Sequence, residues 1–170
     1  MIEPIKNIIR EREEFFDSIN SYISDIYQKI SNTDAKIEII YKKCCDIENI
    51  QNEISRTADK DRYYQYTTFG PHHDDYIFKI DDYDLNSVAS QGQKRMVLIA
   101  FKFALIRFIK NKTGQSPVVL LDDILSELDK DNQTRLLNYI PEDSQIIITN
   151  TDINELNINK NYKLIEIKEE

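Results

Sequence analysis

The stretch Val118-Val119-Leu120-Leu121-Asp122-Asp123 decides the fold class of this chain. Its four consecutive apolar residues, the first two of them β-branched, predict a short strand that is buried inside a parallel sheet. Two carboxylates follow at the C-terminal end of that strand, which is where α/β sheets place their ligands. A carboxylate in such dry surroundings needs a cation, and Mg²⁺ is the usual one. The pattern is typical of the magnesium-holding motif of nucleotide hydrolases, although many strands also end in Asp to begin a turn.

The segments around this stretch predict an α/β fold with a parallel-sheet core, because apolar strands alternate with helices. The long helix has one broad apolar face and ends at Gly114, a residue suited to a helix C-terminus. The expected elements are strands at 63–69, 76–80, 118–121, 146–148 and 162–167, helices at 92–112 and 130–139, and an acidic turn at 81–86.

The first 62 residues predict a mostly helical arm, ahead of a lobe that spans residues 63–170. The opening helix has Pro4 in its first turn and ends near a cluster of cap residues at 31–34. A short strand at 36–42 and a helix at 47–60 are expected next, although one long helix that continues the apolar seam is the alternative. The seam of the opening helix alternates spacings of three and four, apart from Arg12, and predicts packing against a neighbouring helix; its members are Ile5, Ile9, Phe16, Ile19, Ile23, Ile26 and Ile30.

Composition restricts the class of protein. The 170 residues are 41% hydrophobic and 31% charged, which indicates a globular chain. The sequence shows no apolar run of the roughly 20 residues that span a bilayer and no signal-peptide pattern, so we expect a cytoplasmic protein without a membrane partner. The net charge of −8 argues against strong DNA binding by this chain alone. The adjacent Cys44 and Cys45 fit neither a disulfide nor a zinc site and are expected to be reduced thiols.

Two further motifs flank the acidic strand. Ser90-Gln91-Gly92-Gln93 stands where the long helix begins, so free backbone amides and the helix dipole favour an anion there. The simpler interpretation is that Ser90 only caps the helix. Ser126-Glu127-Leu128-Asp129 follows the acid pair and, taken alone, is a loop that leads into a helix. In this order the three motifs match the signature, Walker B and D-loop motifs of ATP-binding-cassette (ABC) ATPases.

Within that superfamily the chain resembles the RecF family of DNA replication and repair proteins. Gly70-Pro71-His72-His73-Asp74-Asp75 is similar to the G-P-H-R-D-D sequence typical of that family, and residues 89–95 are similar to its signature motif. Residues 145–152 are similar to the strand and switch region that follow the D-loop, with Thr149 or Asn150 at the switch position. The resemblance covers residues 61–152 and implies the C-terminal lobe of an ABC-type ATPase head.

Two departures from the family pattern bear on function. His73 replaces the usual arginine, which weakens any contact with phosphate or carboxylate because imidazole is mostly neutral at pH 7. The phosphate-binding loop G-x-x-x-x-G-K-[ST] is absent from a sequence whose three glycines are Gly70, Gly92 and Gly114. We therefore expect no ATP hydrolysis by this chain alone. A metal site at residues 72–75 is disfavoured, because adjacent residues of an extended segment point to opposite faces.

The resemblance implies a mechanism in which two heads enclose ATP and Mg²⁺, so that ATP binding drives homodimerisation. Asp122 would hold Mg²⁺ through water and Asp123 would orient the attacking water. Ser90, Gln91, Gly92 and Gln93 would contact the nucleotide of the partner subunit, while Ser126, Glu127, Leu128 and Asp129 would lie at the dimer interface. The resemblance also implies DNA as a ligand, at single-strand gaps and single/double-strand junctions, and recombination-mediator proteins as partners.

Other functions are open from the sequence. The absent phosphate-binding loop is compatible with a stand-alone, non-enzymatic interaction module. A nucleotide-binding subunit of a membrane transporter is a weaker alternative, because the helical arm and the Gly70-Pro71-His72 segment do not suit it. A metal hydrolase built on residues 72–75 is the weakest.

Overall fold

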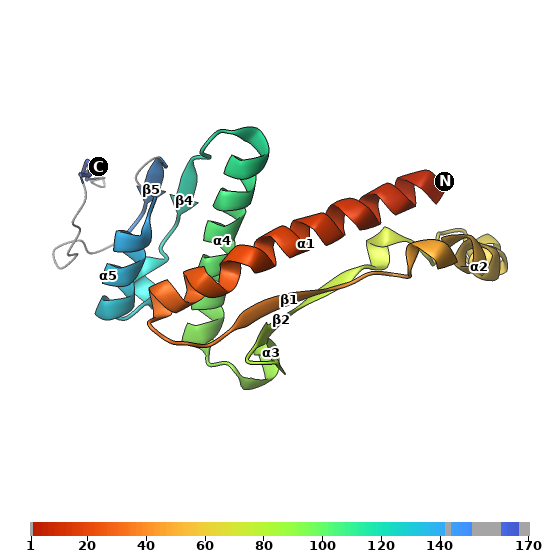
Figure 1. The fold of residues 1–170 in the computed structure, drawn as a ribbon, viewed down its shortest axis with the longest axis horizontal. Helices are drawn as coiled ribbons and strands as arrows, with labels where there is room; N and C mark the ends of the chain where they lie inside the picture. The colour runs from red at the N-terminus through yellow and green to blue at the C-terminus, as the bar shows by residue number, and fades with distance from the viewer. Residues whose placement is uncertain (1, 142–143, 151–160, 167–170) are drawn as a thin grey trace, which may run out of the picture.

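The computed structural model describes residues 2–141, 144–150 and 161–166 (Figure 1). A long helix, an antiparallel sheet and a second helix form one side of the molecule, and a long central helix connects them to a small parallel sheet. The helices are α1 (Ile2–Ser31), α2 (Ile50–Tyr64), α3 (Leu85–Val88), α4 (Gln91–Thr113) and α5 (Lys130–Tyr139); the strands are β1 (Ile37–Lys42), β2 (Asp75–Ile80), β3 (Tyr83–Asp84), β4 (Val119–Leu121) and β5 (Ile146–Ile148); 3-10 turns are η1 (Ile47–Asn49), η2 (Pro71–His73) and η3 (Leu125–Glu127).

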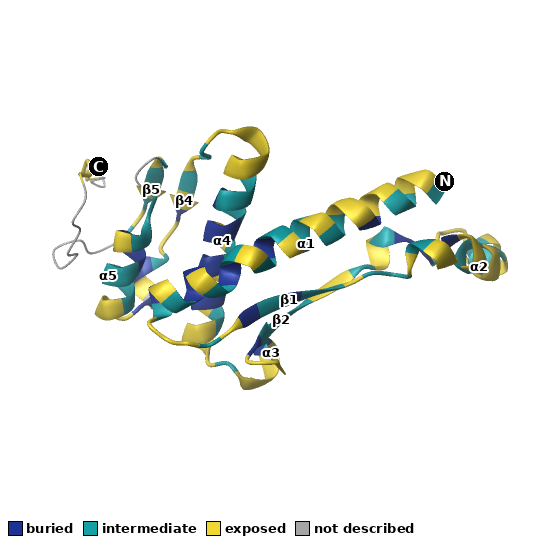
Figure 2. Ribbon diagram, in the orientation of Figure 1, coloured by how far each residue is buried: buried dark blue, intermediate teal, exposed yellow. Residues whose placement is uncertain are grey.

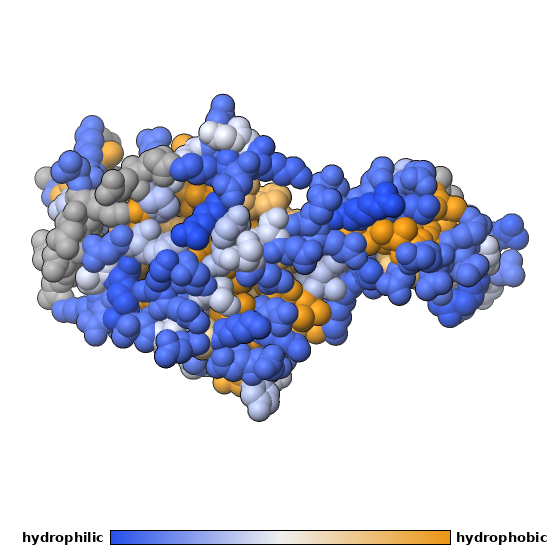
Figure 3. Space-filling model, in the orientation of Figure 1, coloured by the Kyte–Doolittle hydropathy of each residue, from blue (hydrophilic) through white to orange (hydrophobic). Residues whose placement is uncertain are grey.

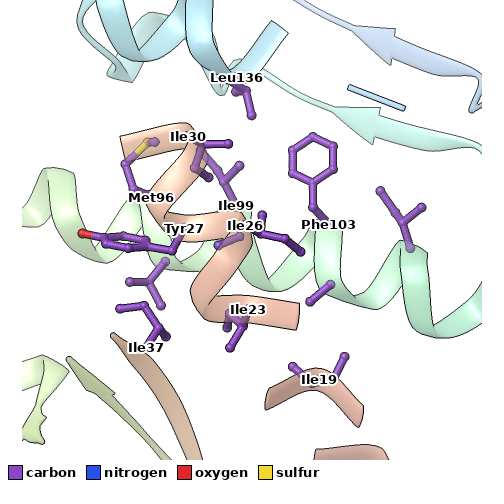
Figure 4. Packing of buried hydrophobic residues seen from close by; sticks show 14 of the residues in the cluster. Ile19, Ile23, Ile26, Tyr27, Ile30, Ile37, Met96, Ile99, Phe103 and Leu136 are labelled. Carbon is purple, nitrogen blue, oxygen red and sulfur yellow. The ribbon is translucent and has the colours of Figure 1, made fainter. Parts of the chain in front are cut away.

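The apolar seam of α1 packs as predicted, and its C-terminal half forms the main core. Ile19, Ile23, Ile26 and Ile30 are fully buried against α4, β1 and α5 (Figure 4). Figure 2 shows the buried residues concentrated where α1 crosses α4. The last turn of α1 is capped from α5, because Arg135 Nε donates to the Ile30 carbonyl at 3.3 Å, which satisfies one of the open carbonyls of a helix end.

The strand predicted at residues 36–42 is confirmed as β1, so the alternative of one continuous helix is wrong. β1 pairs antiparallel with β2, with Ile37 opposite Ile80. Its other edge faces α1, where Asn20 both donates to the Ile39 carbonyl and accepts from the Ile39 amide at 2.9 and 2.8 Å. Ser24 makes the same pair of contacts with Ile37. Side chains of α1 therefore form the hydrogen bonds that a neighbouring strand would otherwise make with β1. Because β1 and β2 contribute residues to the same core, strands from both sides of the predicted boundary at residue 62 pack together.

The N-terminal half of α1 packs in a second, smaller apolar cluster with η1 and α2. Ile9 and Ile50 are fully buried there, and Phe69 anchors the chain that follows α2. The helix predicted at residues 47–60 is confirmed, beginning with η1 and running to Tyr64. Cys44 and Cys45 are free thiols at the edge of this cluster.

Two predicted strands are wrong. In residues 63–69, Tyr63 and Tyr64 end α2 and the remainder is a loop. The loop is fixed by Asp61, whose Oδ1 accepts from both the amide and the hydroxyl of Thr68, at 2.8 and 2.6 Å, so a local contact overrides the strand preference of the aromatic residues. Residues 162–166 form no regular structure, and residue 167 lies outside the described residues.

β4 and β5 form the predicted parallel pair, with Leu121 aligned to Ile148. The long helix and α5 also lie where the sequence placed them. The expected full burial of the strands is wrong, however, because within the described part of the chain only one face of the pair is covered. Val118, Leu120 and Ile147 are at least half exposed, and Leu120 exposes 66% of its surface. Figure 3 shows hydrophobic surface in the upper left, where Figure 1 places these strands. None of the described helices is long and apolar enough to cross a membrane.

Candidate functional site

Asp122 and Asp123 lie at the C-terminal end of β4, where Thr149, at the end of β5, forms hydrogen bonds with both residues. Thr149 Oγ1 donates to Asp122 Oδ1 at 2.5 Å and accepts from the Asp123 amide at 3.0 Å. The Thr149 amide donates to the Leu121 carbonyl at 3.1 Å and extends the strand pairing by one step. A hydroxyl that donates and accepts at once thus holds one carboxylate and positions the backbone of the next residue.

The backbone turns sharply at Asp123. Its φ of 48° is left-handed, a conformation that Asp tolerates better than most residues because its short side chain is polar. The Ser126 hydroxyl donates to the Asp123 carbonyl at 2.8 Å and closes the turn. Both carboxylates are exposed, as is Ser126. Asp122 therefore presents oxygen atoms to solvent at a fixed place, which fits a hydrated Mg²⁺ ion.

The remaining residues of the predicted D-loop have structural contacts. Asp129 caps α5 by accepting from the Asn132 amide at 2.8 Å. Leu128 is buried in the main core, and the Gln133 side chain donates to its carbonyl at 3.0 Å. For Glu127 only the backbone lies within the described part of the chain. Ser126 and Asp129 are both exposed, and the Ser126 hydroxyl is the one that contacts the acidic turn.

The N-terminus of α4 is open to solvent and closely capped. Ser90 Oγ accepts from the Gln93 amide at 3.2 Å, while Gln93 Oε1 accepts from the Ser90 amide at 2.9 Å, a complete capping box. Ser90 therefore caps α4, whether or not the same helix end also binds an anion. A Cβ added to Gly92 would approach only the Ser90 hydroxyl, at 4.0 Å, so the surface beside this glycine is open. All residues from Ser90 to Gln93 are exposed, at the positive end of a 23-residue helix.

The acidic turn after β4 and the N-terminus of α4 lie toward the same end of the molecule. α4 runs away from its N-terminus and β4 returns in the opposite direction after Gly114 (Figure 1). The start of α4 and the end of β4 consequently both face the lower edge of Figure 1.

The Gly70–Asp75 motif has a different arrangement from the one that metal binding would need. The Asp74 side chain is only 3% exposed and accepts from three donors: the Arg12 guanidinium, the Tyr41 hydroxyl and, at 2.8 Å, the Cys44 amide. Arg12 also donates to the Pro71 carbonyl at 2.5 Å. We call this group the Asp74 anchor. It joins α1, the end of β1 and the start of β2 at one point.

Electrostatics of the Asp74 anchor follow from this geometry. Burial raises the pKa of Asp74, but the hydrogen bonds from Tyr41, Cys44 and Arg12 outweigh it and hold that pKa below its usual range. Burial and the Asp74 contact raise the pKa of the Tyr41 hydroxyl, and they raise the pKa of the Cys44 thiol to about 12. Among the residues that the structure describes, no group of three His, Cys, Asp or Glu side chains could hold a metal ion.

Sequence reasoning missed the role of Asp74 and of Arg12. The signal was the arginine that interrupts the apolar seam of α1, since a cation on a buried stripe needs a partner. Gly70 is also explained: its φ of 147° is one that residues with side chains rarely adopt, and a Cβ there would meet the His72 ring at 3.1 Å.

Comparison with known proteins yields many similar sequences, although no model of a known protein family matches the chain. DNA replication and repair protein RecF of Lachnospira eligens is 38% identical over 164 residues, which are 94% of this chain and 45% of that protein. RecF of Agathobacter rectalis is 36% identical over 91% of this chain, and RecF of Streptococcus gordonii is 34% identical over 98%. The chain spans less than half the length of these curated relatives.

Solved structures give the same result. The structure of the recombination mediator protein RecF with ATPrS, in the RecFOR pathway, superposes with a TM-score of 0.76 at 30% identity and covers 93% of this chain and 44% of that one. The Smc head domain of Pyrococcus furiosus shares the fold, with a TM-score of 0.52 at 23% identity. These comparisons give no support to a transporter subunit or a stand-alone interaction module.

Proposed function

Because this chain belongs to the RecF family and matches less than half the length of the members compared, we propose that it supplies the signature, Walker B and D-loop surfaces of a DNA repair ATPase head. The phosphate-binding loop belongs, in this proposal, to another part of a longer protein. The observation that supports it most directly is the fastening of Asp122 and Asp123 by Thr149, at the same end of the molecule as the open N-terminus of α4.

Each residue has a role that its geometry suits. Asp122 binds water molecules of a hydrated Mg²⁺, which, when bound, neutralises charge on the nucleotide phosphates. Asp123 orients the water that attacks ATP, and because Asp is one methylene shorter than Glu, we expect slow turnover, which suits a switch. Of the two candidates for the switch position, Thr149 is favoured over Asn150 because it contacts both members of the acidic pair.

The N-terminus of α4 caps ATP held by a second subunit. Ser90, Gln91, Gly92 and Gln93 are exposed, and the open surface beside Gly92 lets a phosphate approach the backbone amides. Ser126 stands at the dimer contact. ATP binding then drives two heads together and hydrolysis releases them. In this proposal the dimer acts on DNA at single-strand gaps and junctions, with recombination-mediator proteins as partners.

The test joins this chain to the remaining portion of a RecF relative, such as that of Lachnospira eligens, and measures dimerisation by light scattering. We expect dimers only with ATP and Mg²⁺. Ser90→Arg should abolish dimerisation and leave nucleotide binding by each subunit intact, because it blocks only the cap. The matched control is Ser87→Arg, three residues earlier on the exposed face of α3, which should dimerise normally.

A second variant tests the acidic pair. Asp123→Asn keeps the left-handed backbone, because Asn tolerates it as well as Asp does. We expect normal ATP-dependent dimerisation and ATP turnover that is lower by about a hundredfold or more. Dimerisation of the Ser90→Arg protein, or unchanged turnover by Asp123→Asn, would refute these roles.

A further inference from the structure

Three tyrosines that no motif explains gather at the end of α2. Tyr63, Tyr64 and Tyr66 are each more than half exposed. The rings of Tyr63 and Tyr64 meet edge to face with centroids 5.1 Å apart, and those of Tyr64 and Tyr66 lie 5.7 Å apart at an interplanar angle of 31°. We call them the tyrosine cluster. Figure 1 places the end of α2 at the far right, at the opposite end of the molecule from β4 and β5.

The cluster is held on a fixed support. Gln65, in the left-handed conformation, donates from its side chain to the Arg62 carbonyl at 2.7 Å and ends the helix between the tyrosines. Asp61 fastens Thr68, and Phe69 is buried in the second apolar cluster directly after it. Aromatic rings presented on an ordered support lose little conformational entropy when a ligand packs against them.

The charge around the cluster differs from that of the rest of the chain. Between residues 53 and 73 three cations balance three carboxylates, a net charge of zero with neutral histidines, whereas the whole chain carries −8. The cations are Arg56, Lys60 and Arg62, all exposed. The Arg56 guanidinium lies 2.6 Å from the Glu53 carboxylate and that of Arg62 lies 3.4 Å from Asp59, surface ion pairs that are weak enough to exchange for a phosphate. Lys60 lies four residues before Tyr64 and Arg56 lies eight residues before it, so the three share one outward face of α2. The carboxylate of Asp61 is turned to Thr68, whose hydrogen bonds lower its pKa.

We propose that the tyrosine cluster binds single-stranded nucleic acid, with bases stacked on the rings and phosphates along the Arg56–Lys60 face of α2. Exposed aromatic rings beside cations are the general means by which proteins hold single strands, since every base has a stacking face. A duplex fits poorly, because its bases are already stacked on one another and present only their edges. The proposal deepens the proposed function, on which its choice of DNA rests, by naming a DNA contact away from the nucleotide motifs.

The experiment uses this 170-residue chain and a fluorescent oligo(dT) of about 12 nucleotides, a length within the usual range of single-strand sites. Anisotropy at low salt gives the dissociation constant. Replacing all three tyrosines with Ala should weaken binding about tenfold or more, because each stacked base contributes several-fold. Replacing them with Phe should keep affinity within about twofold, since the rings remain.

The matched control replaces Tyr83 and Tyr162, which are equally exposed tyrosines elsewhere in the chain, with Ala. That variant should bind as the parent does. Circular dichroism of every variant distinguishes lost binding from lost folding. Unchanged binding by the triple Ala variant, equal loss in the control, or equal affinity for a blunt duplex of the same length would each overturn the proposal, as would no binding by the parent chain. ATP-dependent dimerisation is indifferent to all these variants, so failure here and failure of the cap at α4 are separate results.

Discussion

Replacing Asp74 with Ala should destabilise the protein far more than the same change at the neighbouring Asp75. The Asp74 side chain is only 3% exposed and accepts from Arg12, Tyr41 and Cys44. Asp75 is exposed, and its side chain accepts from the adjacent Tyr76 amide at 2.8 Å. The two substitutions remove the same atoms from adjacent positions, so their difference measures the Asp74 anchor.

The expected loss in the free energy of unfolding follows from the environment of each donor that loses its acceptor. The Arg12 side chain is 41% exposed, so water can solvate its guanidinium again and the lost ion pair contributes little. The Tyr41 hydroxyl and the Cys44 amide are part-buried, and each left without its acceptor costs roughly 1–2 kcal/mol. We therefore expect a loss of about 2–4 kcal/mol for Asp74→Ala. The same change at Asp75 should cost less than about 0.5 kcal/mol.

The contribution of Asp74 also depends on pH in a defined direction. Its pKa is lower in the folded protein than in the unfolded chain. Its stabilising effect is therefore fully present above the unfolded pKa, near 3.9, and is lost as the pH falls through the lower, folded value. Asp74→Asn removes this carboxyl, so the stability of that variant should fall less steeply than that of the parent below about pH 4.

Urea unfolding followed by circular dichroism at pH 7 measures both variants, and a thermal scan gives the expected midpoint shift of roughly 5–15 °C for Asp74→Ala. The scan at decreasing pH compares the parent with Asp74→Asn. Equal stability of the Asp74→Ala and Asp75→Ala proteins would refute the anchor, and parallel pH profiles of the parent and Asp74→Asn would refute the assigned charge state.

Three further predictions concern the core, the thiols and the candidate site. Ile23→Ala should cost about 2–5 kcal/mol in urea unfolding because it empties a fully buried position, whereas Ile8→Ala, partly exposed on the same helix, should cost less than about 1 kcal/mol. Burial and the Asp74 contact raise the pKa of Cys44 to about 12, so iodoacetamide at pH 8 should alkylate it at least about a hundredfold more slowly in the folded than in the unfolded protein; equal rates by mass spectrometry would contradict this. Thr149→Val should lose roughly 0.5–1.5 kcal/mol, because its hydrogen bonds with the Asp122 carboxylate and the Asp123 amide are exchanged for hydrogen bonds with water, and Thr149→Ser should restore most of that stability if the hydroxyl is responsible.

Much of the fold could be predicted because its elements carry local signals. The apolar seam of α1 has a clear helical period, and the apolar run before Asp122 indicates a strand. Ser90 and Gln93 have the spacing of a capping box at the start of α4. These features depend on residues that are close in sequence. They were sufficient for the α/β architecture and for the resemblance to RecF.

What could not be predicted depends on long-range contacts or on absent neighbours. The break in the apolar seam shows that Arg12 needs a partner, but the partner lies 62 residues later and the sequence does not identify it. The aromatic stretch at residues 63–69 favours a strand by composition, but the contact from Asp61 to Thr68 fixes a helix end and a loop. An apolar run predicts that Leu120 packs against another element, but it does not say which element covers the face that the described residues leave exposed.

The central proposal is that the α4 N-terminus of one subunit contacts ATP held by the other subunit. It is tested most directly with a photoreactive ATP analogue whose label is on the γ-phosphate. This chain lacks a phosphate-binding loop, so in a mixture with the longer joined protein any specific label on it must come from nucleotide that the partner holds. We expect Mg²⁺-dependent labelling of the peptide around Ser90–Gln93, absent when this chain is irradiated alone and lost in its Ser90→Arg variant. Labelling of the joined protein without any transfer to this chain, or equal labelling of this chain by itself, would contradict the assignment of the α4 N-terminus as the cap.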